Sequence, residues 1–145
     1  MIKNNDIKFK LKIDPNNQWF VYAWVTMGGK KSRVEFKVDT GCNSLVISHR
    51  TLKNLGYSTK ESDLSKLPGI TGALASGDKH TFRKIGSVSL FQDKDNSIQI
   101  CKADAVCHST HETHDLLGTE ILRQFSGVNF SLTDDKYMEL TQKLA

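Results

Sequence analysis

The sequence contains little proline, an odd number of cysteines and no long apolar run. Its 145 residues include only two prolines and three cysteines, which are Cys42, Cys101 and Cys107. Three thiols cannot all pair, so the chain does not belong to the disulfide-rich secreted scaffolds, and we expect a reducing, cytoplasmic location. No apolar stretch approaches the roughly 18 residues of a membrane span, and the first residues lack the apolar core of a signal peptide. We therefore expect no membrane partner.

The composition is that of a soluble globular protein, with 38% hydrophobic and 25% charged residues. Its length predicts a single domain over residues 1–145. The charge is uneven: residues 1–53 carry ten Lys or Arg against four Asp or Glu, a net +6, whereas the rest of the chain carries a net −2. A basic half can attract nucleic acid. However, the lysines at 8, 10 and 12 alternate with apolar residues, as in a strand with one solvated face, which argues against a nucleic-acid partner.

Alternating and β-branched patterns predict a mostly β fold. Strands are expected at residues 8–13, 19–27, 32–38, 45–47, 80–91, 98–106, 128–132 and 137–140. Ser48 can cap a short helix that ends at Gly56, and residues 119–125 can form a second one. Residues 57–66 are polar and predict no element. A closed or heavily bent sheet with two short helices is the expected architecture.

One carboxylate stands at the centre of the sequence pattern. The apolar run 36–38 leads to Asp39, the chain turns at Gly41, and a second apolar run follows at 45–47. A carboxylate among apolar residues is costly unless it is paired or hydrogen-bonded, and such carboxylates cluster at functional sites. Asp-x-Gly is also a common turn sequence, so a purely structural use of Asp39 stays open.

Two further segments combine apolar residues with glycine. Residues 67–77 alternate glycines with Ile70, Ala73 and other small apolar residues, which suits a hairpin that closes over a ligand. An ordinary surface loop is the alternative. Near the C-terminus, Leu116, Leu117 and Gly118 precede the second expected helix.

These three features, in this order and over residues 21–140, resemble the retropepsin-like aspartic proteases, single-domain relatives of pepsin that work as homodimers. The resemblance implies a closed acid-protease β-barrel. It also implies an aspartic endopeptidase that hydrolyses extended polypeptide substrates through a water activated by two Asp39 carboxylates, one from each copy. No cofactor and no metal are implied.

The resemblance assigns residues to roles. The catalytic residues are Asp39, Thr40, which is expected to hydrogen-bond across the dimer, and Gly41, beside which the substrate backbone passes. Leu116, Leu117 and Gly118 are expected to pack behind the Asp39 loop, and residues 67–82 to form the flap. The implied substrate-binding residues are Gly41, Asn43, Ile70, Thr71, Gly72, Ala73 and Leu117.

Cys42 departs from the family pattern, which has Ala or Ser at this position. We hypothesise that oxidation of this thiol beside the catalytic acid lowers activity. An inert thiol that packs as a small hydrophobe is the alternative.

Two other functions remain open from the sequence. His108, His111 and His114, spaced three apart, would share one face of a helix and could bind zinc with Cys101 or Cys107, although the intervening Ser and Thr are poor helix formers. Alternatively, the same fold could be a catalytically weak dimeric module that binds peptides, because a fold does not determine its function. The intact Asp39-Thr40-Gly41 sequence favours the enzyme.

Overall fold

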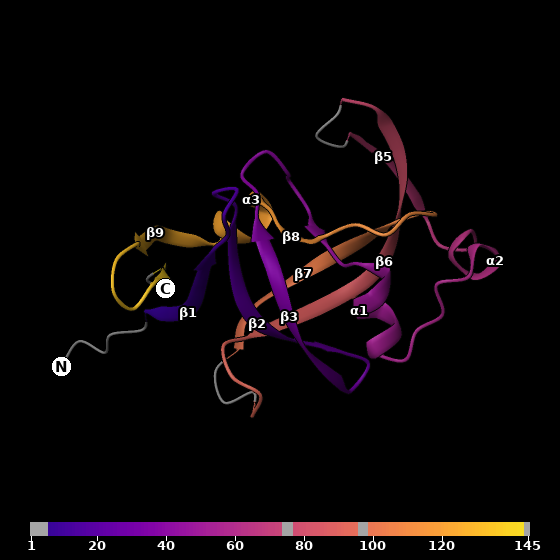
Figure 1. Ribbon diagram of the computed structural model, residues 1–145. Helices are drawn as coiled ribbons and strands as arrows, with labels where there is room; N and C mark the ends of the chain where they lie inside the picture. The colour runs from indigo at the N-terminus through magenta and orange to yellow at the C-terminus, as the bar shows by residue number, and fades with distance from the viewer. Residues whose placement is uncertain (1–5, 74–76, 96–98, 144–145) are drawn as a thin grey trace.

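The computed structural model describes residues 6–73, 77–95 and 99–143, without the side chains at 99–101. Its strands are β1 Ile7–Ile13, β2 Trp19–Met27, β3 Lys30–Val38, β4 Leu45–Val46, β5 Gly69–Ala73, β6 Lys79–Phe91, β7 Gln99–His108, β8 Asp115–Leu117, β9 Phe125–Ser131 and β10 Tyr137–Gln142. The helices are α1 His49–Asn54, α2 Glu61–Leu64 and α3 Thr119–Leu122 (Figure 1).

Within the described residues the strands form one sheet that closes on itself. The strand order is β5-β6-β7-β4-β8-β3-β2-β1-β10-β9, and β6 pairs additionally with β2. This pairing joins Trp24 to Phe91 and Thr26 to Ser89, and it turns β6, β7, β4, β8, β3 and β2 into a ring. The described chain is therefore a closed six-stranded barrel, extended by β1, β10 and β9 on one side, as the sequence predicted.

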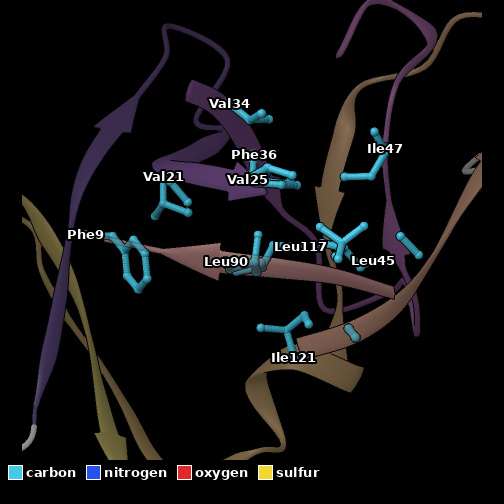
Figure 2. Close-up of a cluster of buried hydrophobic side chains, with 14 of the residues drawn as sticks. Phe9, Val21, Val25, Val34, Phe36, Leu45, Ile47, Leu90, Leu117 and Ile121 are labelled. Carbon is cyan, nitrogen blue, oxygen red and sulfur yellow. The ribbon is translucent and has the colours of Figure 1, made fainter. Parts of the chain in front are cut away.

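The core lies inside this barrel because the strands alternate between buried and outward residues. In β1 the buried residues are Ile7, Phe9 and Leu11, and the lysines between them are exposed. Figure 2 shows aliphatic side chains from β2, β3, β4, β6, β8 and α3 meeting around Phe36 and Leu117. Phe36 is completely buried, so its replacement by Ala is expected to cost about 3–5 kcal/mol.

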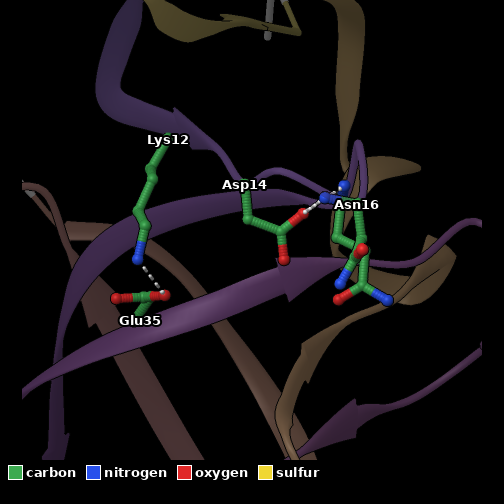
Figure 3. Close-up of polar contacts among 5 residues, drawn as sticks. Lys12, Asp14, Asn16 and Glu35 are labelled. Atoms are coloured by element: carbon green, nitrogen blue, oxygen red, sulfur yellow. Dashed lines mark hydrogen bonds and ion pairs between the residues drawn. The ribbon is translucent and has the colours of Figure 1, made fainter.

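Short turns join the strands where the sequence places Asp, Asn and Gly. After β1, the Asp14 carboxylate accepts hydrogen bonds from the backbone N–H groups of Asn16 and Gln18, 3.0 and 2.8 Å away. Asn17 follows with a positive φ of 60°, which Asn tolerates. Figure 3 shows this turn beside the Lys12–Glu35 ion pair, which links β1 to β3.

The helices show where the sequence prediction succeeded and where it was wrong. Ser48 caps α1 as expected, and Gly56, with φ of +85°, follows the helix end. However, the described chain has three short helices rather than two, because Glu61–Leu64 forms α2. The helix predicted at 119–125 ends at Leu122, and Phe125 already begins β9.

No helix in the described part of the chain is both long enough and apolar enough to cross a membrane.

Candidate active site

The loop that carries Asp39 is framed by the two strands that flank it in the chain, β3 and β4, and by β8 from a distant part of the chain. β3 runs parallel to β8, with Val38 opposite Leu117, and β4 runs antiparallel to β8, with Leu45 opposite the same Leu117. The chain therefore leaves β3, turns through residues 39–44 and returns as β4 on the other side of β8. Asp39 lies at the end of a strand that is fixed on both sides.

Backbone hydrogen bonds hold the Asp39 loop in one conformation. The N–H of Asp39 donates to the carbonyl oxygen of Leu117 at 3.1 Å, and the N–H of Cys42 donates to the carbonyl oxygen of Asp39 at 3.1 Å. The N–H of Gly41 donates to Oδ1 of the Asp39 carboxylate at 3.0 Å. Asp39 is half-buried, and Thr40 and Gly41 are exposed. The loop thus presents one oriented carboxylate at the surface.

Gly118 is required by close backbone contact behind this loop. A Cβ at position 118 would lie 2.5 Å from the carbonyl oxygens of both Cys42 and Ser44. The backbone beyond it donates back to the loop, from Thr119 to the carbonyl oxygen of Cys42 at 2.9 Å and from Glu120 to that of Asn43 at 2.8 Å. The start of α3 therefore closes on the loop, which only a residue without a side chain at 118 allows.

A cleft of about 410 Å³ lies between this loop and the β5–β6 hairpin. Figure 1 shows the hairpin extending from the barrel on the same side as the loop that follows β3. The cleft is lined by Gly41, Cys42, Asn43, Ser44, Val46, Ile70, Thr71, Gly72, Ala73, Phe82 and Val106. Six of the residues that the sequence assigned to substrate binding therefore line one cleft.

Leu117 is the exception among the predicted substrate-binding residues. Its side chain is 3% exposed and belongs to the barrel core, so it supports the Asp39 loop from behind and does not line the cleft. The neighbouring Leu116 points the other way and packs against the small apolar cluster of Val46, Phe82 and Val106 beside the cleft. The two side chains lie on opposite faces of β8, and neither lines the cleft.

The hairpin above the cleft is a regular strand pair within its described residues. Ile70 pairs with Phe82 and Gly72 with His80. The Phe82 ring lies so close to Gly72 that a Cβ there would be 2.9 Å from it. At the base of the hairpin, the Arg83 guanidinium donates to the carbonyl oxygen of Leu67 at 3.2 Å. Residues 74–76 of the predicted flap lie outside the described residues.

Both the sequence and the fold of the chain are similar to those of aspartyl proteases. A family model described as aspartyl protease matches residues 23–106, more than half of the chain. The chain belongs to the aspartyl protease family. Its structure is similar to the crystal structure of a retropepsin-like aspartic protease from Rickettsia conorii, with a TM-score of 0.58 and 19% sequence identity, over 95% of this chain and 91% of that chain. No curated protein matches the sequence.

The resemblance to the retropepsin-like aspartic proteases and the closed β-barrel, both expected from the sequence, are confirmed. Family and fold together support a protease-type function.

Cys42, the departure from the family pattern, lies half-buried in the wall of the cleft. Its thiol donates to the carbonyl oxygen of Ser44 at 3.4 Å. Burial raises the pKa of this thiol, and the neighbouring Asp39 adds to the effect, while the Ser44 contact opposes it. At neutral pH the residue is therefore a thiol rather than the more reactive thiolate.

Two acidic residues that the sequence did not single out, one at the start of β8 and one in the loop before it, hold the N-terminus of α1. The Asp115 carboxylate is 3% exposed and accepts from the N–H of Ser48 at 2.6 Å and from the Thr51 hydroxyl at 2.9 Å. Glu112 accepts from the next two N–H groups of the helix, those of His49 and Arg50. Burial raises the pKa of Asp115 despite these donors. The sequence did not predict these contacts because Asp115 and Glu112 lie more than 60 residues from the α1 residues that they bind.

The zinc site considered from the sequence is contradicted within the described residues. His108 ends β7 and His111 and His114 lie in the following loop, so the three do not share a helix face. No group of three or more His, Cys, Asp or Glu among the described residues could hold a metal ion. The side chain of Cys101 lies outside the described residues.

Proposed function

We propose that this chain is an aspartic endopeptidase that hydrolyses peptide bonds in extended polypeptides as a homodimer. In this proposal residues 1–145 form one retropepsin-like protease domain. Two copies meet on a two-fold axis, and each supplies Asp39 to one shared site. A cytoplasmic location is part of the proposal and is supported by the cysteine content alone.

The observation that carries the proposal is the placement of Asp39. Asp39 lies on a loop that is hydrogen-bonded to β8. The same loop and the β5–β6 hairpin form the two walls of a cleft of about 410 Å³. A loop fixed by five hydrogen bonds from backbone N–H groups is pre-organised for chemistry, since its carboxylate loses little freedom when a substrate binds. One copy supplies one such loop, whereas peptide hydrolysis by this chemistry needs two carboxyl groups.

In the proposed mechanism the two Asp39 carboxyl groups share one proton. Two carboxyls this close do not both ionise, so the charged one acts as the general base toward a water molecule. The protonated one donates its proton to the carbonyl oxygen of the substrate as the water adds. The carboxyl that took the water's proton then donates it to the leaving nitrogen, while a hydroxyl of the tetrahedral intermediate returns a proton to the other carboxylate as the C–N bond breaks. Thr40 is exposed and is proposed to hydrogen-bond to the partner copy's loop, which would fix the separation of the two acids.

The cleft residues are proposed to bind the substrate main chain. Gly41 and Asn43 form the floor, and the β5 strand can add its free edge to an extended peptide, because β5 ends the strand order of the described sheet. Residues 67–82 would act as the flap that covers the peptide and excludes water from the acids.

The test is cleavage of a casein or peptide-library substrate by the wild type, by Asp39→Asn and by the control Asp134→Asn. Asp134 lies exposed in the turn between β9 and β10 with φ of 56°, a conformation that Asn also adopts. We expect Asp39→Asn to lose activity by about 10³-fold or more and Asp134→Asn to retain it. Cleavage that survives Asp39→Asn contradicts the proposal, whereas peptide binding without cleavage by the wild type indicates the peptide-binding module.

A further inference from the structure

Three histidine rings from different segments meet beside the β6 arm of the β5–β6 hairpin, at the end of β7. His108 at the end of β7 is 2% exposed, and its Nε2 lies 2.9 Å from Nδ1 of His80 on β6. The ring centroids are 4.9 Å apart for His80 and His108, and 4.8 Å apart for His108 and His111. On the other side, Nε2 of His49 from α1 lies 2.6 Å from the carbonyl oxygen of His108.

The hydrogen-bond partners assign the protons of this cluster. Nδ1 of His108 accepts from the backbone N–H groups of Thr110 at 3.1 Å and His111 at 2.8 Å, so it carries no proton. Neutral His108 must then have its proton on Nε2 and donate it to Nδ1 of His80. A proton can be added to His108 only by displacing two N–H donors, and to Nδ1 of His80 only by breaking the bond between the rings.

The histidine pair is part of the cleft's support. His80 pairs with Gly72 across the hairpin, and Phe82, two residues further along β6, pairs with His108 on β7. The Phe82 ring packs edge-on against the His108 ring, with centroids 5.3 Å apart, and it also lines the cleft and packs with Val46 and Val106. Backbone pairing holds β6 to β7 as far as Thr81, whose carbonyl oxygen accepts from the N–H of Ser109, and the bond between the rings adds a side-chain link one residue further along the hairpin arm.

We propose that His80 and His108 are positioning residues, whose mutual hydrogen bond holds the described arms of the β5–β6 hairpin over the cleft only while both rings are neutral. Acid then loosens the hairpin from β7. The consequence for catalysis rests on the proposed function, because it takes the cleft to be the substrate site. The consequence for the hairpin itself does not.

The direction of the pH effect follows from the surroundings of His108. Three titratable groups face His108, and all of them are cationic when protonated: His80 on β6, His111 in the loop and His49 on α1. The acidic residue nearest to His80 along the chain is Asp78. Burial, then these three histidines, lowers the pKa of His108 from its ordinary 6.5. The loosened state binds the proton better, so the hairpin is fully held above pH 6.5 and is released as the pH falls below it.

Hydrogen exchange measured by mass spectrometry tests the hairpin directly. Peptides covering residues 69–73 and 79–84 are compared at about pH 7.5 and about pH 5, after correction for intrinsic exchange, in wild type, His80→Ala and the control His114→Ala. His114 is an exposed histidine of the same loop region, outside the cluster. We expect wild type and His114→Ala to lose about tenfold protection on acidification, and His80→Ala to be poorly protected at both pH values.

A second variant separates titration from simple packing. His80→Gln offers an amide oxygen that accepts the His108 bond but does not titrate, so it should keep neutral-pH protection and show a smaller acid effect than the wild type. Equal wild-type protection at the two pH values, or His80→Ala behaving as His114→Ala, overturns the proposal.

A kinetic comparison separates this proposal from the proposed function. If the chain cleaves peptides, His80→Ala should raise KM several-fold at neutral pH with kcat less affected, because the cleft wall and not the acid pair is disturbed. An unchanged KM in His80→Ala counts against the role in substrate binding. If no variant cleaves any peptide, the proposed function fails, while the exchange data still decide whether the histidine pair holds the hairpin.

Discussion

The N–H of Asp39 donates to the carbonyl oxygen of Leu117 across 3.1 Å, which adds one more bond to the parallel pairing of β3 and β8 beyond Val38 and Leu117. The proposed catalytic acid is therefore attached through its main chain to the core, since the Leu117 side chain on the same strand is buried there. Substitutions behind the loop should therefore shift the position of Asp39 without contacting its side chain.

Gly118→Ala should test this support most severely. The added Cβ would lie 2.5 Å from two backbone carbonyl oxygens of the Asp39 loop, which cannot move aside as a flexible side chain can. We expect a loss of about 3 kcal/mol or more in the free energy of unfolding, measured by urea denaturation.

Gly127→Ala in β9 is the matched control for this substitution. Its nearest contacts would be ordinary ones with the Thr141 side chain at 3.7 and 3.8 Å, so we expect a change within about 1 kcal/mol. Equal destabilisation by the two substitutions would contradict the account given for Gly118.

Asp115→Asn should destabilise the chain at neutral pH. The carboxylate satisfies donors from Ser48 and Thr51 in a buried position, and an amide can accept at only one of its two polar atoms, so we expect a cost of about 1–3 kcal/mol by thermal or urea unfolding.

The pH dependence of the same variant carries a definite sign. Because the pKa of Asp115 is raised in the folded state above its ordinary 3.8, the folded chain takes up a proton before the unfolded chain does. This group alone makes wild-type stability rise as the pH falls from neutral toward 3.8. The stability difference between wild type and Asp115→Asn should therefore grow on acidification. A constant difference would mean that Asp115 does not titrate in this way.

Cys42 should react slowly with peroxide at neutral pH. Its raised pKa keeps it protonated, so loss of activity on peroxide treatment should be slow at neutral pH and accelerate as the pH rises toward the ordinary thiol value of 9. The comparison is residual cleavage activity of wild type and Cys42→Ala after the same treatment, with mass mapping of the oxidised residue. Identical sensitivity of the two proteins would eliminate Cys42 as the site of inactivation.

Specific activity should depend on protein concentration if two copies form the site. Dilution below the dimer dissociation constant is expected to lower activity per milligram, in parallel with the dimer fraction measured by sedimentation. Activity per milligram that stays constant while the chain sediments as a monomer would rule out the shared pair of Asp39 residues.

The strands and the acid loop were predictable from sequence because their signals are local. The aromatic and β-branched residues at 19–27 predicted β2 with its observed bounds, and Ser48 and Gly56 predicted the two ends of α1. The single-turn helix α2 was missed because only Leu64 of its four residues is buried, which leaves no periodic pattern.

Features that depend on distant contacts were not predictable. Two adjacent leucines, Leu116 and Leu117, carry no local signal for which one faces the core, and only the pairing with β3 and β4 decides it. The histidine spacing suggested a helix face, yet the partner of His108 is His80, brought there by the pairing of β6 with β7.

The pairing of residues 36–38 with 115–117 also bears on the order in which the chain can fold. The strand that supports Asp39 is made almost 80 residues after it, and contacts of such high sequence separation form slowly. A fragment ending before residue 115 would contain the complete Asp39-Thr40-Gly41 sequence without the strand that holds it in place. If the chain is the proposed protease, the incomplete chain should therefore be unable to cleave its neighbours during synthesis until residues 115–117 have been made and paired with β3.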